Sequence, residues 1–378
     1  MLKSRILQSV ILLSLSLLFC FAIVEIGVRI FANDNLHYFP HPRFLYQLDK
    51  YRGYKLAKNS RGVFRDPQNE YISRADTNSL GMRDYEYGEK GENTFRILVL
   101  GDSFTFGAGV EFEDTFVKQL ESILRQKNNG KKYEVINAGV LGYGTDQEYY
   151  YLKEWGFKLK PDLVIVAFYI QNDIMDVMIG ALNHYTVKDG YLFDLFEHKQ
   201  KEKCKNFFER YSRAYEFIED RVNNLLIKKG LKKKPWENSG IPLDMKFYLK
   251  KYPPKFEEAM NKTKGFLKGI DSLEKQIGGK SLIFLIPARI QVFEGSFAKA
   301  LIRYHENPAN YSVTRINDEL ANFTEENKIP FLDILPSQRE YEKEIDLFLT
   351  SDPHWNKEGH KLVAKTIYDY LVSNGMVK

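Results

Sequence analysis

The sequence has few of the residues that cross-link a chain or bind a metal. Its 378 residues include two cysteines: Cys20 lies in an apolar run and Cys204 in a lysine-rich stretch. Two such positions do not indicate a disulfide framework, so the fold must be held together by packing. His354 and His360 are close in sequence but lack further ligands at metal-binding spacings. We therefore expect neither a metal nor another cofactor.

Signals for nucleic-acid binding are also missing. The formal net charge is +5, but the lysines are spread over predicted helices, with no nucleic-acid-binding fold signature or aromatic RNA-binding motif beside them. The length allows one large α/β domain with additional segments. These properties favour a globular protein that does not bind nucleic acid.

One long hydrophobic run is present, close to the N-terminus. Residues 6–24 carry no charge, and as a helix they span about 28 Å, close to the hydrocarbon thickness of a bilayer. Lys3 and Arg5 precede the run, which favours a cytoplasmic N-terminus under the positive-inside rule. We expect the rest of the chain in the periplasm or outside the cell, held to the membrane through residues 6–31.

A cleaved signal peptide is the alternative interpretation of this run. No small-x-small cleavage site follows it, and apolar residues continue at helical spacing through residues 25–31. Phe19 stands before Cys20, where a lipoprotein site needs a small residue. We predict an uncleaved, single-pass anchor over residues 1–32.

The remainder divides into a wrapping segment and an α/β domain. Residues 33–92 show little periodicity and contain a predicted turn at 78–83, whereas residues 93–378 alternate apolar runs with amphipathic patterns. The expected strands cover residues 96–100, 133–137, 163–169, 281–287 and 330–334, and the expected helices cover residues 113–127, 146–154, 255–276, 312–326 and 357–372. This order predicts a three-layer α/β fold with a five-stranded, parallel, doubly wound sheet of the flavodoxin type.

The interval 179–254 breaks this alternation and is predicted to be a helical insertion. It mixes aromatic residues, Phe207, Phe208 and Tyr211 among them, with lysine runs such as 232–234. Long insertions often line active sites, so a lid or a glycan-contacting cap is one interpretation. A solvated helical hairpin with its aromatic side chains packed inward is the other.

A serine follows the first predicted strand. Ser103 lies just past residues 96–100, and the carboxyl edge of a parallel sheet is where open α/β folds bind ligands. Gly101 allows a sharp turn there, and the N–H groups beyond it could face a developing negative charge. A helix-capping role for Ser103 is the alternative.

Other polar groups follow the later strands. Gly139 and Asn172 come after the second and third strands, where a backbone N–H and a side-chain amide can donate to an oxyanion. Asp352 and His354 come after the last strand, and side chains two apart in an extended segment share a face, so the carboxylate can orient the ring. His360 is the rival base, inside the last predicted helix. Four such elements converging on one sheet edge favour catalysis over separate structural roles.

Together these residues resemble the four blocks of the SGNH/GDSL hydrolase family, in the right order over residues 96–372. The resemblance implies Ser103 as nucleophile, His354 as base with Asp352, and an oxyanion hole formed by Ser103, Gly139 and Asn172. Three positions depart from the pattern: Phe104 replaces leucine, Gln171 replaces glycine, and the aspartate stands two residues before the histidine instead of three.

The resemblance also suggests a substrate. The Asp-x-His-Trp-Asn spelling of residues 352–356 is similar to that of SGNH proteins associated with exopolysaccharide O-acetylation. This implies a serine esterase that removes acyl groups, acetyl in particular, from a cell-surface glycan or related ester. An O-acyltransferase acting on an exported polysaccharide and a non-catalytic glycan-binding module are the alternatives.

Overall fold

The computed structural model describes most of the chain as two compact units. The described residues are 2–31, 42–65, 70–127, 130–180, 185–188, 190–194, 212–229, 231, 242–293, 295–350 and 352–377. One unit comprises Met1–Phe39 and Asp194–Gly240, and the other comprises Pro40–Phe193 and Ile241–Lys378. Each unit is described below by itself.

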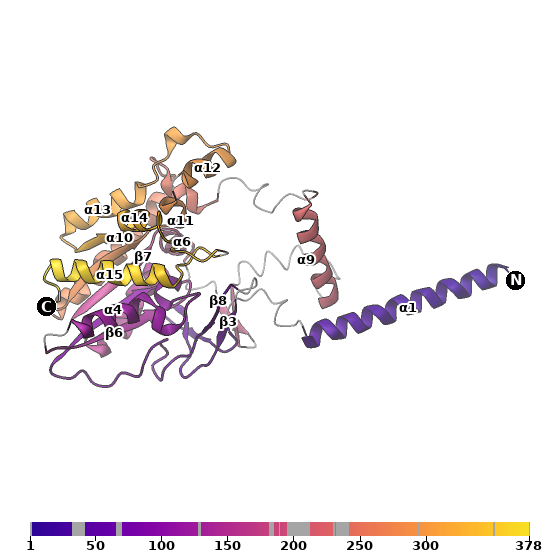
Figure 1. Ribbon diagram of the computed structural model, residues 1–378, viewed down its shortest axis with the longest axis horizontal. Coiled ribbons are helices and arrows are strands. Elements are labelled where there is room, and N and C mark those ends of the chain that lie inside the picture. The colour runs from indigo at the N-terminus through magenta and orange to yellow at the C-terminus, as the bar shows by residue number, and fades with distance from the viewer. Residues whose placement is uncertain are drawn as a thin grey trace. The chain divides into compact units, whose positions relative to one another are not determined.

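A five-stranded parallel sheet forms the centre of the larger unit (Figure 1). Its strands are β5 (Thr94–Gly101), β6 (Lys132–Gly139), β7 (Leu163–Tyr169), β10 (Lys280–Ile286) and β11 (Phe331–Asp333). They lie in the order β11-β10-β7-β5-β6, so the direction of winding reverses between β5 and β7. Gly101 pairs with both Gly139 and Ala167, which aligns the ends of these three strands. The predicted α/β fold is confirmed, and its switch point lies beside the end of β5.

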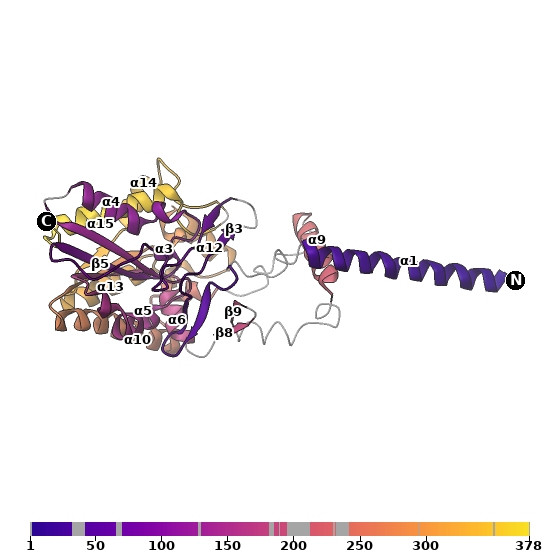
Figure 2. The same cartoon turned by 90° about the horizontal axis from the view of Figure 1, so that it is seen from below.

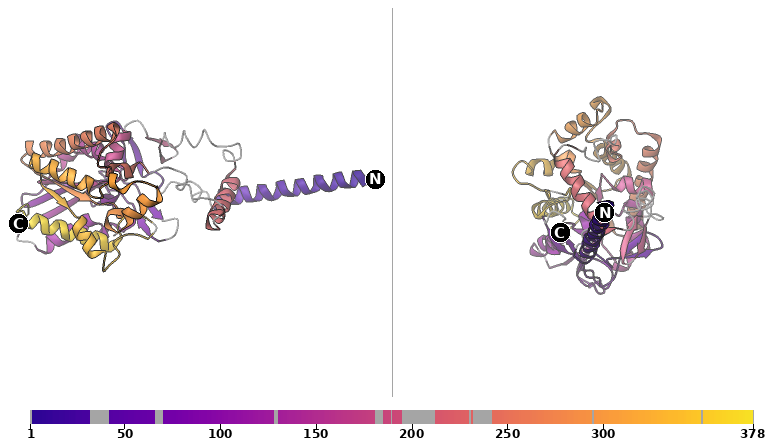
Figure 3. Two further views of the ribbon diagram at one scale, coloured as in Figure 1. Left: turned by 90° about the horizontal axis from the view of Figure 1, so that it is seen from above. Right: turned by 90° about the vertical axis from the view of Figure 1, so that its right-hand side faces the viewer.

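Helices cover both faces of this sheet. The order of the layers is visible in Figure 2 and from the opposite side in Figure 3: α4 and α15 pack together on one face, and α5, α6 and α10 lie on the other. Every residue of β7 is buried, as expected for a central strand covered on both sides. The helices are α3 (Ser103–Phe106), α4 (Phe116–Gln126), α5 (Thr145–Glu154), α6 (Asp173–Ile179), α10 (Pro254–Gln276), α11 (Arg289–Val292), α12 (Ser296–Arg303), α13 (Arg315–Asn327), α14 (Leu335–Tyr341) and α15 (Lys357–Ser373), with 3-10 turns at Phe112–Asp114, Gly156–Leu159, Asp244–Tyr248 and Pro308–Asn310.

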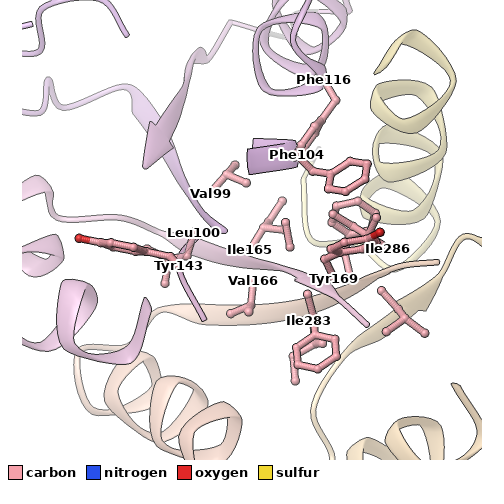
Figure 4. Packing of buried hydrophobic residues seen from close by; sticks show 14 of the residues in the cluster. Val99, Leu100, Phe104, Phe116, Tyr143, Ile165, Val166, Tyr169, Ile283 and Ile286 are labelled. Carbon is pink, nitrogen blue, oxygen red and sulfur yellow. The ribbon is translucent and has the colours of Figure 1, made fainter. Parts of the chain in front are cut away.

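Apolar side chains from these elements form one continuous core. In Figure 4, Phe104 and Phe116 lie on one side of the strands, and Val166 and Ile283 lie on the other. Trp355 is fully buried against Phe104 and Phe116, with ring centroids 4.7 and 6.1 Å away. Trp355 directly follows His354, so its burial in the core fixes the position of the segment that carries His354.

Helix boundaries differ by a few residues from the prediction for 113–127. The structure places a 3-10 turn at Phe112–Asp114 and starts α4 at Phe116. Thr115 is the reason, because its side-chain oxygen accepts a hydrogen bond from the Lys118 N–H at 3.4 Å and caps the new helix.

The segment before the sheet forms small hairpins and a tight turn. The hairpins pair β1 (Tyr46–Asp49) with β2 (Gly53–Leu56) and β3 (Val63–Arg65) with β4 (Ile72–Arg74). The predicted turn is present: the Asn78 side chain accepts hydrogen bonds from the N–H groups of Leu80 and Met82 at 2.9 and 3.0 Å. Gly81 has φ of 81°, a conformation that favours glycine.

The interval predicted as a helical insertion also contains strands. A hairpin of β8 (Tyr185–Lys188) and β9 (Tyr191–Asp194) turns at Gly190, which has φ of 84°. Aromatic and β-branched residues on either side of an Asp-Gly pair are a hairpin signal that the prediction overlooked. Helix α9 (Arg213–Lys228) follows. Phe207, Phe208, Tyr211 and the lysines at 232–234 lie outside the described residues.

The smaller unit contains α9 and the long helix α1 (Leu2–Phe31). Residues Gln8–Ile30 of α1 are apolar enough and long enough to cross a membrane. Residues 8–24 of this stretch are exposed rather than packed in a core, whereas Val28 is buried. A helix of this kind so close to the N-terminus fits either a membrane anchor or a signal sequence.

Candidate active site

Ser103 lies on a sharp turn between β5 and α3. Gly101 ends the strand with φ of 159°, and a Cβ atom there would overlap the Thr105 hydroxyl. Asp102 is the N-cap of α3, since its carboxylate accepts a hydrogen bond from the Phe104 N–H at 2.9 Å. The capping role considered for Ser103 is therefore filled by its neighbour, which leaves the Ser103 hydroxyl for other contacts.

The Ser103 hydroxyl contacts His354, which is 251 residues further along the chain. The distance from Ser103 Oγ to His354 Nε2 is 2.6 Å, and His354 Nδ1 contacts Asp352 Oδ1. When Nδ1 donates to the carboxylate, Nε2 is left to accept a proton from the serine. Burial works against ionisation of Asp352, but hydrogen bonds and charge from His354 outweigh it and lower the pKa of this carboxyl. The structure thus brings together three of the predicted site residues.

The loop that carries Asp352 and His354 is held at its base. An antiparallel bridge joins Phe348 to Trp355, and the Leu349 N–H donates to the His354 carbonyl at 2.9 Å. From α11, Arg289 Nη1 donates to the Leu349 carbonyl at 2.9 Å and reaches the Asp352 carbonyl at 3.5 Å. The Arg289 charge also contributes to the lowered pKa of Asp352.

His360, the rival base, has a structural role. It is almost fully buried, its Nδ1 accepts a hydrogen bond from the Phe116 N–H at 3.1 Å, and its ring stacks on the Phe116 ring. Burial lowers its pKa to about 3, so the ring is neutral at physiological pH. His360 therefore accepts a hydrogen bond from a backbone N–H at the start of α4, and no hydrogen bond between described residues joins it to Ser103.

The predicted oxyanion donor Gly139 already has a hydrogen-bond partner. Its N–H donates to Asn137 Oδ1 at 2.9 Å, and it is buried so closely that a Cβ atom would overlap the Phe106 backbone. Gly142, three residues further on, is partly exposed with φ of 73°, and no described residue accepts its N–H. Tyr54 holds this turn by donating its hydroxyl to the Leu141 carbonyl at 2.7 Å. Gly142 was not singled out from the sequence, because the spelling alone does not distinguish it from its neighbouring glycines.

Asn172 lies at the end of β7, on the other side of the switch point. It is the N-cap residue of α6, it is partly exposed, and its Nδ2 donates to Asp176 Oδ2 at 3.2 Å. Burial raises the pKa of the neighbouring Asp102 carboxyl, and a hydrogen bond from the Asn172 side chain opposes part of this rise. The amide therefore lies beside the turn that carries Ser103, within a largely acidic environment.

Several carboxyl groups surround this part of the site. They are Asp102 on the serine turn, Asp146 and Glu148 on α5, and Asp173 and Asp176 on α6. Burial is the largest cause of a raised pKa in all five, and repulsion between neighbouring carboxylates adds to it for Glu148, Asp173 and Asp176. The pKa rises to about 6 for Asp102 and to about 8 for Asp176. At neutral pH part of this cluster is therefore protonated.

Arg83 holds the serine turn from the wrapping segment. Its side chain is fully buried and donates to the carbonyls of Phe106, Gly107 and Val110 at 2.8–2.9 Å. Burial lowers its pKa to about 10, so the guanidinium stays charged. Arg83 thus satisfies the carbonyl groups that follow α3, a function that the sequence pattern does not reveal.

The family of the chain follows from comparison with known proteins. A family model described as GDSL-like lipase/acylhydrolase matches residues 97–367, a range that includes Ser103, Asn172, Asp352 and His354. The chain belongs to the GDSL acylhydrolase family. It is accordingly a carboxylic ester hydrolase, and Ser103 occupies the serine position of the Gly-Asp-Ser sequence.

Solved structures and curated proteins add little to this GDSL assignment. An acetyl xylan esterase matches with 14% identity and a TM-score of 0.41, over 73% of this chain and 98% of its own. The esterase EstA from Pseudoalteromonas sp., inhibited by monoethylphosphonate, matches with 12% identity and a TM-score of 0.41, over 76% and 100%. TesA matches with 12% identity and a TM-score of 0.38, over 73% and 97%. No curated protein matches the sequence.

Proposed function

We propose that this GDSL acylhydrolase acts through an acyl-enzyme on Ser103. The contact between Ser103 Oγ and His354 Nε2 at 2.6 Å carries the proposal. His354 removes the hydroxyl proton as the oxygen attacks an ester carbonyl, and it then gives that proton to the departing alcohol. In the second half, His354 takes a proton from water, the hydroxide attacks the acyl group, and Ser103 regains its proton as the acid leaves. Asp352 holds the ring and balances the imidazolium charge.

The negative oxygen of each tetrahedral intermediate needs hydrogen-bond donors. We place the N–H groups of Ser103 and Gly142 and the Asn172 amide in this role, because they follow the carboxyl ends of the three neighbouring strands β5, β6 and β7. Gly139 is replaced in this role because its N–H is bonded to Asn137. Asn172→Ala should lower kcat by roughly 10²- to 10³-fold, as loss of one oxyanion donor does in such sites.

The substrate and the cellular location are part of the same proposal. The resemblance of residues 352–356 to proteins linked to exopolysaccharide O-acetylation supports an acyl ester, acetyl in particular, on a cell-surface glycan. The exposed apolar helix α1 supports a single-pass anchor, with the N-terminus in the cytoplasm and the catalytic unit in the periplasm or outside the cell.

A phosphonate probe and product analysis test the proposal. The intact protein should be labelled at Ser103, and Ser103→Ala and His354→Ala should each abolish labelling and the hydrolysis of an acetyl ester. With an acetylated glycan and a glycan acceptor, release of free acetate supports the hydrolase, whereas transfer to the acceptor indicates the acyltransferase. An unlabelled protein that still bound glycan would instead be the binding module.

A further inference from the structure

Helix α9 carries a stripe of exposed apolar side chains. Ile218, Val222 and Leu225 are 47%, 47% and 53% exposed, and their spacing of four and three residues places them on one face of the helix. Isolated apolar residues are common on protein surfaces, but a continuous stripe on one helix marks a contact surface.

The start of α9 is bonded to the end of α1 (Figure 2). Glu25 of α1 accepts hydrogen bonds from the Ser212 hydroxyl at 2.9 Å and from the Ala214 N–H at 2.8 Å. A carboxylate at a helix N-terminus satisfies free N–H groups and interacts favourably with the helix dipole. Ala214 and Val28 are buried in this unit, so the last turns of α1 and the first turn of α9 pack together.

In a membrane-spanning α1, this contact fixes the depth in the membrane at which α9 begins. Glu25 is the first charged residue after the uncharged run of residues 6–24, so in a membrane-spanning α1 it lies where the helix leaves the hydrocarbon. Ala214, Ile218, Val222 and Leu225 follow one another at helical steps, so the exposed stripe continues the face that packs near α1.

The charge that follows α9 fits a lipid surface. Five lysines occur within residues 228–234 of the sequence. Basic residues beside an amphipathic helix strengthen its binding to anionic headgroups, while its apolar face enters the boundary of the acyl chains.

We propose that α9 lies in the headgroup layer of the membrane that α1 crosses, with Ile218, Val222 and Leu225 facing the acyl chains. Glu25 fixes the starting point of α9, so α1 must be retained for this arrangement. The inference rests on the proposed anchoring role of α1 and is independent of the ester chemistry at Ser103.

Quenching by brominated lipids tests this arrangement. The full chain, with Cys20 and Cys204 replaced by serine, would carry a fluorophore on one new cysteine and be reconstituted into phosphatidylcholine and phosphatidylglycerol vesicles brominated near the top of the acyl chains. Labels at Ile218→Cys, Val222→Cys and Leu225→Cys should be quenched about twofold more than a label at Asp220→Cys, a position that helical spacing places on the opposite side of α9, since an apolar face enters only the upper acyl region. Glu25→Gln, which keeps an acceptor oxygen, should preserve this pattern, and Glu25→Leu should weaken it.

Three other outcomes would contradict the inference in different ways. Vesicle-bound protein with equal, weak quenching at all four positions would overturn the position of α9 and leave the anchor intact. Disulfide dimers of the unlabelled Val222→Cys protein, together with no quenching of the labelled protein, would show that a second copy covers the stripe. Protein that does not float with vesicles would refute the anchor and α9's position together. The activity of Ser103 would be unaffected by any of these three results.

Discussion

The two sides of the active site are built in different ways. Ser103 lies on a turn whose following residues are buried in the core and whose carbonyl groups are bonded to buried Arg83. Asp352 and His354 lie on a loop, with side chains 28% and 19% exposed, that is held by Arg289 and by the buried Trp355. The position of the nucleophile is thus a property of the core, whereas the position of the base depends on a small number of contacts.

The largest expected effect tests whether Ser103 and His354, one from each side of the site, act together in catalysis. Ser103→Ala and His354→Ala should each lower kcat/KM for an acetyl ester by roughly 10⁴- to 10⁶-fold, and the double variant should be no worse than the poorer single variant. The reason is that the imidazole has no proton to remove once the hydroxyl is gone. Losses that multiply in the double variant, measured with the same ester, would mean that the two residues act independently.

Arg83 should affect stability more than chemistry. Arg83→Met removes hydrogen bonds to three buried carbonyl groups, so we expect the free energy of unfolding to fall by roughly 2–4 kcal/mol. Urea unfolding would measure this, and Arg61→Met, at an exposed position of the same segment, is the matched control with an expected change within about 0.5 kcal/mol. An Arg83→Met protein as stable as the control would show that the core holds the serine turn without this side chain.

Replacing Arg289 should affect catalysis more than stability, which is the opposite of what we expect for Arg83. Arg289→Met removes the hydrogen bond to the Leu349 carbonyl and loosens the loop, so kcat should fall about 10-fold through poorer placement of His354. Because Arg289 is only partly buried, we expect a change of about 1 kcal/mol or less in the free energy of unfolding. Arg289→Lys, which keeps a cation, should recover part of kcat. A stability loss as large as that of Arg83→Met would remove the distinction between the two sides.

The sequence was sufficient to predict the sheet because its strands are nearly continuous apolar runs. Residues 163–169 were predicted as a strand and form β7 with the same bounds, since a strand covered on both faces admits few polar residues. The β8–β9 hairpin was not predicted, because the surrounding interval was interpreted as helical. Short hairpins depend on the conformation of one or two turn residues, here Gly190, and leave a weaker pattern.

The sequence predicted only those site residues whose type is required by the chemistry. Ser103, Asp352 and His354 were named from their spelling and from their place after strands, and the structure brings them into contact. Gly142 differs from Gly139 in backbone conformation, in exposure and in having no described acceptor for its N–H, and no spelling reveals these differences. Arg83 and Arg289 act through hydrogen bonds to distant carbonyl groups, and such contacts leave no local pattern in a sequence.

The smallest expected effect concerns the protonation of the carboxyl groups beside the turn that carries Ser103. Burial and the nearby carboxylates of Asp102 and Asp146 raise the pKa of Asp176 to about 8 from an ordinary value of 3.8. Below about pH 4 the group is protonated in both the folded and unfolded states. Between about pH 4 and 8 the unfolded chain ionises while the folded chain keeps its proton, so stability from this group is lost as the pH rises through the folded pKa.

Asp176→Asn removes this dependence and keeps an acceptor oxygen near the Asn172 amide. The variant should therefore melt at a higher temperature than the wild type at pH 9, and the difference should shrink as the pH approaches 4, which thermal unfolding at several pH values would measure. A difference that stays constant across this range would mean that Asp176 is ionised in the folded protein. In that case the Asn172 amide would have to face a full negative charge 3.2 Å away, and a donor committed to that charge would be a poor ligand for an oxyanion. The pH series therefore tests Asn172 as well: neutral Asp176 leaves the amide available to the substrate, and ionised Asp176 removes one of the three proposed donors on the serine side.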